Sequence, residues 1–332
     1  MGVKKIWNSD GLLMDSPSPN PLPPGEGELM DGHGAASDSK MSNFSQGQGK
    51  HGQTPFELLC GSYLLTLGPR TLMMGILNVT PDSFSDGGLY FDKEDAVARG
   101  EALAAAGADI IDIGGESSRP FSEPVPAEEE IRRVVPVIEE LARYVSVPIS
   151  IDTTKVLVAR QALEAGAVMV NDIGALRIDP AMADLVADAD VPVVLMHMKG
   201  TPKTMQIDPQ YEDVVDEVKT FLADVIHAAE QAGIDRSKII VDPGIGFGKT
   251  VGHNLRLIKD LRALEPLGVP IVIGLSRKSF ISKLLGPGDE RREVGTQAAV
   301  AAAALNGAHI VRVHDVERTG ETLKLVDAIK NS

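Results

Sequence analysis

The chain has 332 residues, of which 43% are hydrophobic, 4% aromatic and 24% charged, a composition typical of soluble globular proteins rather than fibrous or peptide-sized ones. Its 32 lysines and arginines against 47 aspartates and glutamates give a net charge of −15, which argues against a partner bound through nucleic-acid phosphates or anionic lipid. The single cysteine, Cys60, excludes an intrachain disulfide and favours a reducing compartment, so we expect a cytoplasmic protein.

Residues 1–55 are predicted to form a disordered, low-complexity extension. Five prolines lie between Pro17 and Pro24, and apolar residues are too sparse to compensate for the entropy of ordering. No run approaches the roughly 20 apolar residues needed to cross a bilayer, so we expect no membrane segment. Two alternatives stay open: a proline-rich recognition segment, and a translation start at Met41.

From residue 56 to residue 332 the pattern predicts strands that alternate with helices. Gly-Ala or Val-Pro pairs precede six short apolar runs. Glycine is typical of the position just after a helix, and proline is tolerated at the first residue of a strand. Continuous apolar runs are typical of parallel strands that are buried on both faces. With two further runs, the predicted strands are Leu72–Leu77, Asp109–Ile113, Ile149–Ile151, Val168–Val170, Val193–Met196, Ile239–Val241, Ile271–Ile273 and His309–Val313. Eight such units in about 265 residues predict an α/β fold, a (β/α)8 TIM barrel, with a doubly wound open sheet as the rival.

Polar residues follow each predicted strand, at the end where barrels of this kind carry their catalytic groups. The set is Asn78, Glu116, Ser117, Ser118, Arg119, Asp152, Asn171, Asp172, His197, Asp242, Ser276, Arg277, Lys278, Arg312 and His314. Asp152 and Asp242 with Asn171 would suit a flat heterocycle that presents adjacent N–H donors. The alternative is that each aspartate is only a helix N-cap, because Thr153 and Pro243 follow at once.

A phosphate or pyrophosphate is the second ligand that these residues suggest. Lys278, Arg312 and His314 offer cationic donors, and Arg119 and Ser118 add to them. The glycine-rich loop 242–250 is not a P-loop, because proline stands at position 243, but its glycines let the backbone approach a ligand closely. No His/Cys cluster predicts a metal site, whereas the oxygen of Asn78 together with ligand phosphates would fit Mg²⁺.

Eight motifs, in order along residues 71 to 330, resemble those of dihydropteroate synthase. The first is MGILNVTPDSFSDGG at 74–88 and the second is DIGGESSRP at 112–120. The others are DT at 152–153, NDI at 171–173, MHM at 196–198, DPGIGFGK at 242–249, SRKS at 276–279 and RVHD at 312–315. The chain is therefore identified as similar to this family, a group of transferases in folate biosynthesis and the targets of sulfonamides.

The resemblance implies condensation of 6-hydroxymethyl-7,8-dihydropterin pyrophosphate with p-aminobenzoate, giving 7,8-dihydropteroate and pyrophosphate, by a homodimer. It implies that Asn78 binds Mg²⁺, that Asp152, Asn171, Asp242 and Lys278 hold the pterin, and that Ser118, Arg312 and His314 hold the pyrophosphate. It places Asp82, Phe84 and Asp86 in a mobile loop, Arg119, Pro120 and Ser279 beside the aminobenzoate, and Met196, Phe247 and Val313 among the other substrate-binding residues. Asp152, Asp242, Lys278, Arg312 and His314 form the expected catalytic set, which stabilises the departing pyrophosphate and the positive charge on the pterin.

The second motif departs from the family pattern at two positions. Ser118 stands where the family has threonine, and Phe121 where it has glycine, which leaves sulfonamide sensitivity open. Three rival functions remain. They are a pterin-binding methyltransferase that passes a methyl group from methyltetrahydrofolate to a corrinoid partner, an aldolase with Lys278 as a Schiff-base lysine, and a non-catalytic barrel.

Overall fold

The structure is a computed structural model that describes residues 5–7, 13–15, 55–80, 93–117, 123–201 and 203–332. The chain divides into two units, Met1–Gln48 and Gly49–Ser332. In the first unit, β1 (Lys5–Trp7) and β2 (Leu13–Asp15) pair in antiparallel register, a short hairpin that the sequence patterns had not indicated. The rest of the extension predicted over 1–55, Pro55 excepted, lies outside the described residues.

The second unit contains eight parallel strands that follow one another around a ring. They are β5 (Leu72–Asn78), β6 (Ile110–Gly114), β7 (Ile149–Asp152), β8 (Met169–Asp172), β9 (Val193–Met196), β10 (Ile239–Asp242), β11 (Val272–Gly274) and β12 (Ile310–Val313). β12 pairs with β5, and a parallel bridge between Val241 and Ile271 joins β10 to the start of β11. Because this bridge closes the ring, the predicted TIM barrel is confirmed and the open sheet is excluded.

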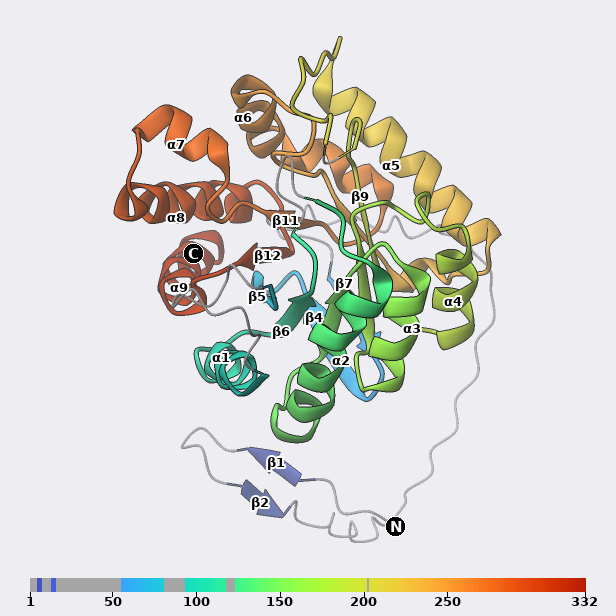
Figure 1. The fold of residues 1–332 in the computed structure, drawn as a ribbon. Coiled ribbons are helices and arrows are strands. Elements are labelled where there is room, and N and C mark those ends of the chain that lie inside the picture. The colour runs from blue at the N-terminus through green and yellow to red at the C-terminus, as the bar shows by residue number, and fades with distance from the viewer. Residues whose placement is uncertain (1–4, 8–12, 16–54, 81–92, 118–122, 202) are drawn as a thin grey trace, which may run out of the picture. The chain divides into compact units, whose positions relative to one another are not determined.

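Helices connect successive strands and surround them (Figure 1). They are α1 (Lys93–Ala105), α2 (Ala127–Tyr144), α3 (Val156–Glu164), α4 (Ala181–Ala189), α5 (Val214–Gln231), α6 (Val251–Lys259), α7 (Ser279–Leu285), α8 (Asp289–Leu305) and α9 (Val316–Lys330), with 3-10 turns η2 (Arg236–Lys238) and η3 (Leu261–Leu267). Pro126 stands at the N-cap position of α2 and three glutamates occupy the first turn, where their charge is favourable. Among the described helices, none combines the length and apolar character that a bilayer crossing requires.

The strands are mostly apolar because both of their faces are covered. Ile111 and Ile113 of β6 pack in a cluster with the surrounding helices, whereas Ile110 packs in a second cluster inside the barrel. Successive side chains of a strand point to opposite faces, so every second residue enters the barrel. This alternation decides which side chains can reach a ligand within the ring.

A hairpin closes the amino-terminal end of the barrel. β3 (Phe56–Cys60) and β4 (Tyr63–Leu67) pair in antiparallel register just before β5. Leu58, Cys60 and Leu67 are fully buried in the same cluster as the inward-facing residues of the strands. The apolar floor that they form leaves the carboxyl ends of the strands as the face on which a polar site can be built.

We expect Leu67→Ala to destabilise the protein by about 2 to 5 kcal/mol, because it leaves a cavity in this floor. Leu64→Ala in the same strand is the matched control, since the Leu64 side chain is 58% exposed. Urea unfolding of both variants measures the difference. Equal losses in the two variants would show that the hairpin does not seal the barrel.

Candidate active site

Above the apolar floor the barrel contains a polar layer. Five strands contribute to it the side chains of Asp112, Asp152, Asn171, Asp242 and Arg312. Four of them follow, by two positions, a strand residue that packs inside the barrel with the β3–β4 hairpin. Side chains two positions apart on a strand point to the same face, so these four also point into the barrel. All five lie in the last three residues of their strands, at the carboxyl ends where catalytic groups of such barrels are found.

Arg312 is the centre of this layer. Its Nε donates to Asp112 Oδ2 at 2.5 Å and its Nη2 donates to Asp152 Oδ2 at 2.6 Å. Burial lowers the pKa of Arg312, but the carboxylates of Asp112 and Asp152 outweigh burial and raise that pKa above its ordinary value. Asn171 Nδ2 also donates to Asp112 Oδ2, at 2.9 Å, so one oxygen accepts from two strands.

The two predicted aspartates are not helix caps. The N-cap of α3 is Lys155 and that of α6 is Thr250, so the N-cap alternative is wrong: loop residues separate each aspartate from its helix. Burial raises the pKa of Asp152 to about 7, although Arg312 acts in the opposite direction. Burial also raises the pKa of Asp242, whose Oδ1 accepts from the Gly244 N–H at 2.7 Å.

A small cavity opens beside these groups. Its lining consists of Asp152, Asn171, Ile173, Met196, Asp242, Ile245, Phe247, Gly274, Lys278 and Arg312. Lys278 Nζ lies 4.1 Å from the centroid of the Phe247 ring, a cation–π contact. Burial lowers the pKa of Lys278 to about 8, against the attraction of Asp242. The cavity therefore combines carboxylate and amide acceptors with an ammonium donor and an aromatic face.

The loop 243–250 forms one wall of this cavity and is fixed to the end of β9. Gly244 has φ +68°, and a Cβ built there would lie 1.9 Å from His197 O. Lys249 Nζ lies 2.8 Å from His197 Nδ1 and donates to Phe247 O at 3.0 Å. Burial lowers the pKa of His197 to about 3, so its neutral ring accepts from the lysine. The glycine and the buried lysine together hold Phe247 in place.

The residues predicted for a pyrophosphate are only partly brought together. His314 lies at the end of β12, with Nδ1 2.9 Å from Ser276 Oγ, whereas Arg312 is engaged by the two carboxylates deeper in the barrel. Val313 packs in the outer cluster and Ser279 is exposed at the start of α7, so neither side chain lines the cavity. The predicted residues Asp82, Phe84, Asp86, Ser118, Arg119 and Pro120, and also Phe121, lie outside the described residues.

Asn78 is the only candidate that the sequence offered for a metal. It ends β5 beside Gly114, is half-buried, and receives no side-chain hydrogen bond from the described residues. Within the described ranges, no group of three His, Cys, Asp or Glu side chains could hold a metal ion. A single amide oxygen suits a divalent cation that takes its other ligands from phosphate and water, as Mg²⁺ commonly does.

Asp112 is the site residue that the sequence reading missed. The predicted site residues are those that follow each apolar run, whereas Asp112 stands inside the run IIDIG of β6. Its signal was its position, two residues after the inward-facing Ile110. A charged residue on the inward face of a buried strand needs a partner of opposite charge, here Arg312.

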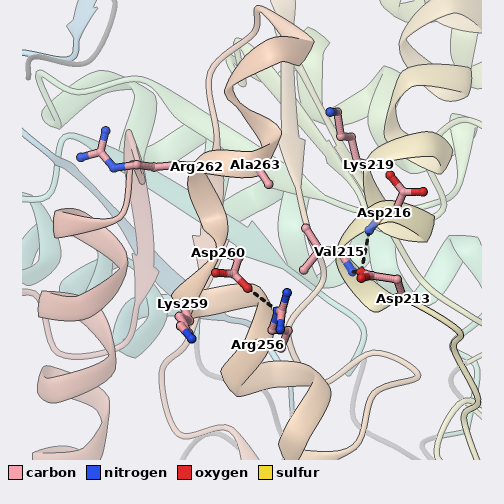
Figure 2. A pocket seen from close by; sticks show the side chains of 9 residues that line it. All are labelled: Asp213, Val215, Asp216, Lys219, Arg256, Lys259, Asp260, Arg262 and Ala263. Carbon is pink, nitrogen blue, oxygen red and sulfur yellow. Dashed lines mark hydrogen bonds and ion pairs between the residues drawn. The ribbon is translucent and has the colours of Figure 1, made fainter.

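A second hollow lies on the outer surface between the start of α5 and the segment of α6 and η3, as Figure 2 shows. Asp213 caps α5 by accepting from the Val215 and Asp216 N–H groups, at 2.9 and 3.1 Å. Arg256 pairs with Asp260 within the neighbouring segment. Because these charged groups bond within their own segments, we place the functional site at the carboxyl ends of the barrel strands and not in this hollow.

Comparison with known proteins gives a consistent result. Residues 74–314 match the family model described as pterin binding enzyme. Dihydropteroate synthase of Escherichia coli K12 is 47% identical over 256 residues, which cover 77% of this chain and 90% of the relative. That of Synechocystis is 45% identical over 276 residues, covering 83% of this chain and 96% of the relative.

Solved structures match as well. Xanthomonas albilineans dihydropteroate synthase with 4-aminobenzoic acid superposes with a TM-score of 0.79 at 50% identity, covering 84% of this chain and all of the other. The same enzyme in complex with 7,8-dihydropteroate gives 0.76 at 49% identity, over 83% of this chain and 99% of the other. A Yersinia pestis dihydropteroate synthase with a sulfonamide drug gives 0.80 at 42% identity, over 83% of this chain and 100% of the other.

Gly244→Ala tests the close approach of the loop to β9. We expect a loss of more than about 1 kcal/mol in the free energy of unfolding, because the added Cβ collides with His197 O and the backbone has a positive φ. Gly252→Ala, in α6, is the control: its Cβ would meet only Thr250 Oγ1, at 3.9 Å, so stability should stay or rise slightly. Thermal unfolding of the two variants measures this, and a stable Gly244→Ala protein would contradict the assigned geometry.

Proposed function

The chain belongs to the pterin-binding enzyme family and is a dihydropteroate synthase. We propose that the polar layer of its barrel holds the pterin and stabilises the charges that develop as pyrophosphate leaves. The enzyme condenses 6-hydroxymethyl-7,8-dihydropterin pyrophosphate with p-aminobenzoate, giving 7,8-dihydropteroate and pyrophosphate in folate biosynthesis. This is a transferase reaction, and the comparisons favour it over the methyltransferase alternative.

The observation that carries the pterin assignment is the set of acceptors around the cavity. Asp152 and Asp242 offer carboxylate oxygens and Asn171 offers an amide oxygen, from the carboxyl ends of β7, β10 and β8. The aminopyrimidinone edge of a pterin presents several N–H donors side by side, which such acceptors complement. Lys278 supplies a donor for a ring nitrogen or carbonyl, and Met196 provides an apolar contact for the ring.

The chemistry requires stabilisation of charge rather than a covalent intermediate. As the C–O bond to pyrophosphate breaks, positive charge develops on the pterin methylene and ring. Asp152 and Asp242, fixed before the reaction by their neighbours, stabilise that charge. The neutral aniline nitrogen of aminobenzoate then forms the new C–N bond and loses one proton, for which the departing pyrophosphate is an acceptor.

The leaving group is assigned to His314, Ser276 and Arg312. His314 and Ser276 lie at the ends of adjacent strands, and Arg312 adds a permanent positive charge beneath them. Asn78 fits Mg²⁺ by the chemistry of its amide oxygen, as described above; when bound, the ion would neutralise pyrophosphate charge. Phe247 lines the cavity and is proposed to contact the substrates there. Arg119, Pro120 and Ser279 stay predictions for the aminobenzoate side.

We further propose a homodimer that forms through the outer helices, in the cytoplasm. Large apolar side chains are exposed on three consecutive helices, α7 to α9: Leu284 at 53%, Leu285 at 46%, Val294 at 57%, Leu325 at 66% and Ile329 at 57%. These helices lie next to one another (Figure 1). Exposed apolar residues gathered on neighbouring helices are typical of a protein interface. The single buried Cys60 supports a reducing compartment.

Replacing either aspartate tests the catalytic assignment. Asp152→Asn and Asp242→Asn should each lower kcat more than about 100-fold, the effect of removing one preorganised electrostatic group. Release of pyrophosphate from the two substrates with Mg²⁺ is the assay. Asp216→Asn on the surface of α5 is the control and should keep normal turnover. Near-normal turnover of either cavity variant would refute the assignment.

The dimer is tested by placing charge on the exposed apolar helices. Val294→Glu together with Leu325→Glu should convert a dimer to a monomer at micromolar concentration, because buried unpaired carboxylates are costly. Light scattering coupled to gel filtration measures the mass. Leu157→Glu in α3, at a residue 54% exposed, is the control and should stay dimeric. A monomeric parent protein would contradict the proposed dimer.

A further inference from the structure

We propose that Asp112 is a positioning residue that sets the hydrogen-bonding polarity of the pterin pocket. It acts through two neighbours: it holds the Asn171 amide in one orientation, and it shares the Arg312 guanidinium with Asp152. The inference rests on the proposed function of the cavity, and it adds a residue that does not line that cavity.

The position of Asp112 is suited to this task. Its side chain is fully buried in the middle of β6, and its Oδ2 accepts from both Asn171 Nδ2, at 2.9 Å, and Arg312 Nε, at 2.5 Å. These partners come from β8 and β12, so one carboxylate oxygen links three strands of the barrel. Its Oδ1 is buried without a hydrogen-bond partner among the described residues.

The contact with Asp112 decides which way the Asn171 amide faces. A carboxylate paired with a guanidinium has acceptors only, so the Asn171 atom that meets it must be the NH₂ group. The amide oxygen is then the polar atom left for the cavity, which Asn171 lines. Without Asp112 the amide could rotate and present its NH₂ group instead. Asp112 thus gives the pocket a third acceptor beside Asp152 and Asp242.

The second effect concerns charge. Arg312 contacts Asp112 through Nε and Asp152 through Nη2. In a variant without the Asp112 carboxylate, the Arg312 guanidinium would keep only Asp152 of these two partners. It would then bind the Asp152 carboxylate more firmly. The pterin needs the same carboxylate as an acceptor. Both effects predict that loss of Asp112 weakens binding of a donor-rich heterocycle and leaves the aminobenzoate side unchanged.

The test compares two heterocycles that differ at one position. Pterin carries an amino donor where lumazine carries a carbonyl acceptor, and isothermal titration of each gives its dissociation constant. Asp112→Leu removes charge and acceptor, Asp112→Asn keeps an acceptor oxygen but removes charge, and Ser150→Ala is the control. Ser150 is opposite Asp112 in register, fully buried, and its Oγ has no partner among the described residues.

We expect Asp112→Leu to weaken pterin binding by about 10- to 100-fold, the effect of losing hydrogen bonds to a charged group. The dissociation constant of lumazine should change less than about threefold. The ratio of the two dissociation constants, which measures the preference for pterin, therefore falls by at least about threefold. In turnover assays the KM for the pterin pyrophosphate should rise while the KM for aminobenzoate stays. Asp112→Asn should lie between Asp112→Leu and the parent protein, and Ser150→Ala should match the parent in every measurement.

Two results would overturn the proposal: an unchanged preference for pterin in both Asp112 variants, or equal weakening of both heterocycles and of aminobenzoate. The second result would show a general structural defect. If Asp112→Leu does not fold, Asp112→Asn alone decides, because it keeps the shape of the side chain. A parent protein that does not prefer pterin over lumazine would instead refute the proposed pterin pocket, which separates the two failures.

Discussion

The pairing of the Arg312 guanidinium with Asp112 and Asp152 is the interaction on which the site depends. Burying a charge is costly unless opposite charges and hydrogen bonds compensate for it, and Arg312 has Asp112 on one edge and Asp152 on the other. These contacts fix the relative positions of β6, β7 and β12. Asn171 joins the same network through Asp112, so the acceptors of the pocket are positioned before any ligand arrives. Catalysis by fixed charges requires this kind of preorganisation.

The surrounding fold makes such a network possible by separating two environments within one ring. Near the amino-terminal end the inward-facing residues are apolar and pack on the β3–β4 hairpin. Two residues further along β6, β8, β10 and β12 they are polar. The low polarity of the floor strengthens every electrostatic contact above it. A chain with a net charge of −15 can therefore hold an anionic substrate, because local cations and not the total charge determine its binding.

Sequence patterns predicted the strands well and the contacts between them poorly. Gly-Ala and Val-Pro boundaries and continuous apolar runs located all eight strands, and no end differs by more than two residues. Asp152 and Asp242 were found because each ends its strand. Asp112 was missed because it stands inside an apolar run and its partner Arg312 is 200 residues away. The hairpin at residues 56–67 and the second helix between β11 and β12 depend on tertiary packing, which no local pattern reports.

The closed amino-terminal end of the barrel determines how substrates enter and products leave. Leu58 and Leu67 pack into the amino-terminal end of the ring, so within the described residues a ligand reaches the polar layer from the carboxyl ends of the strands. Both substrates enter and both products leave from that side. A product molecule in the mouth therefore keeps the next pterin out until it has gone. Departure of the product is an obligatory step between any two turnovers, whatever the speed of the chemistry beneath it.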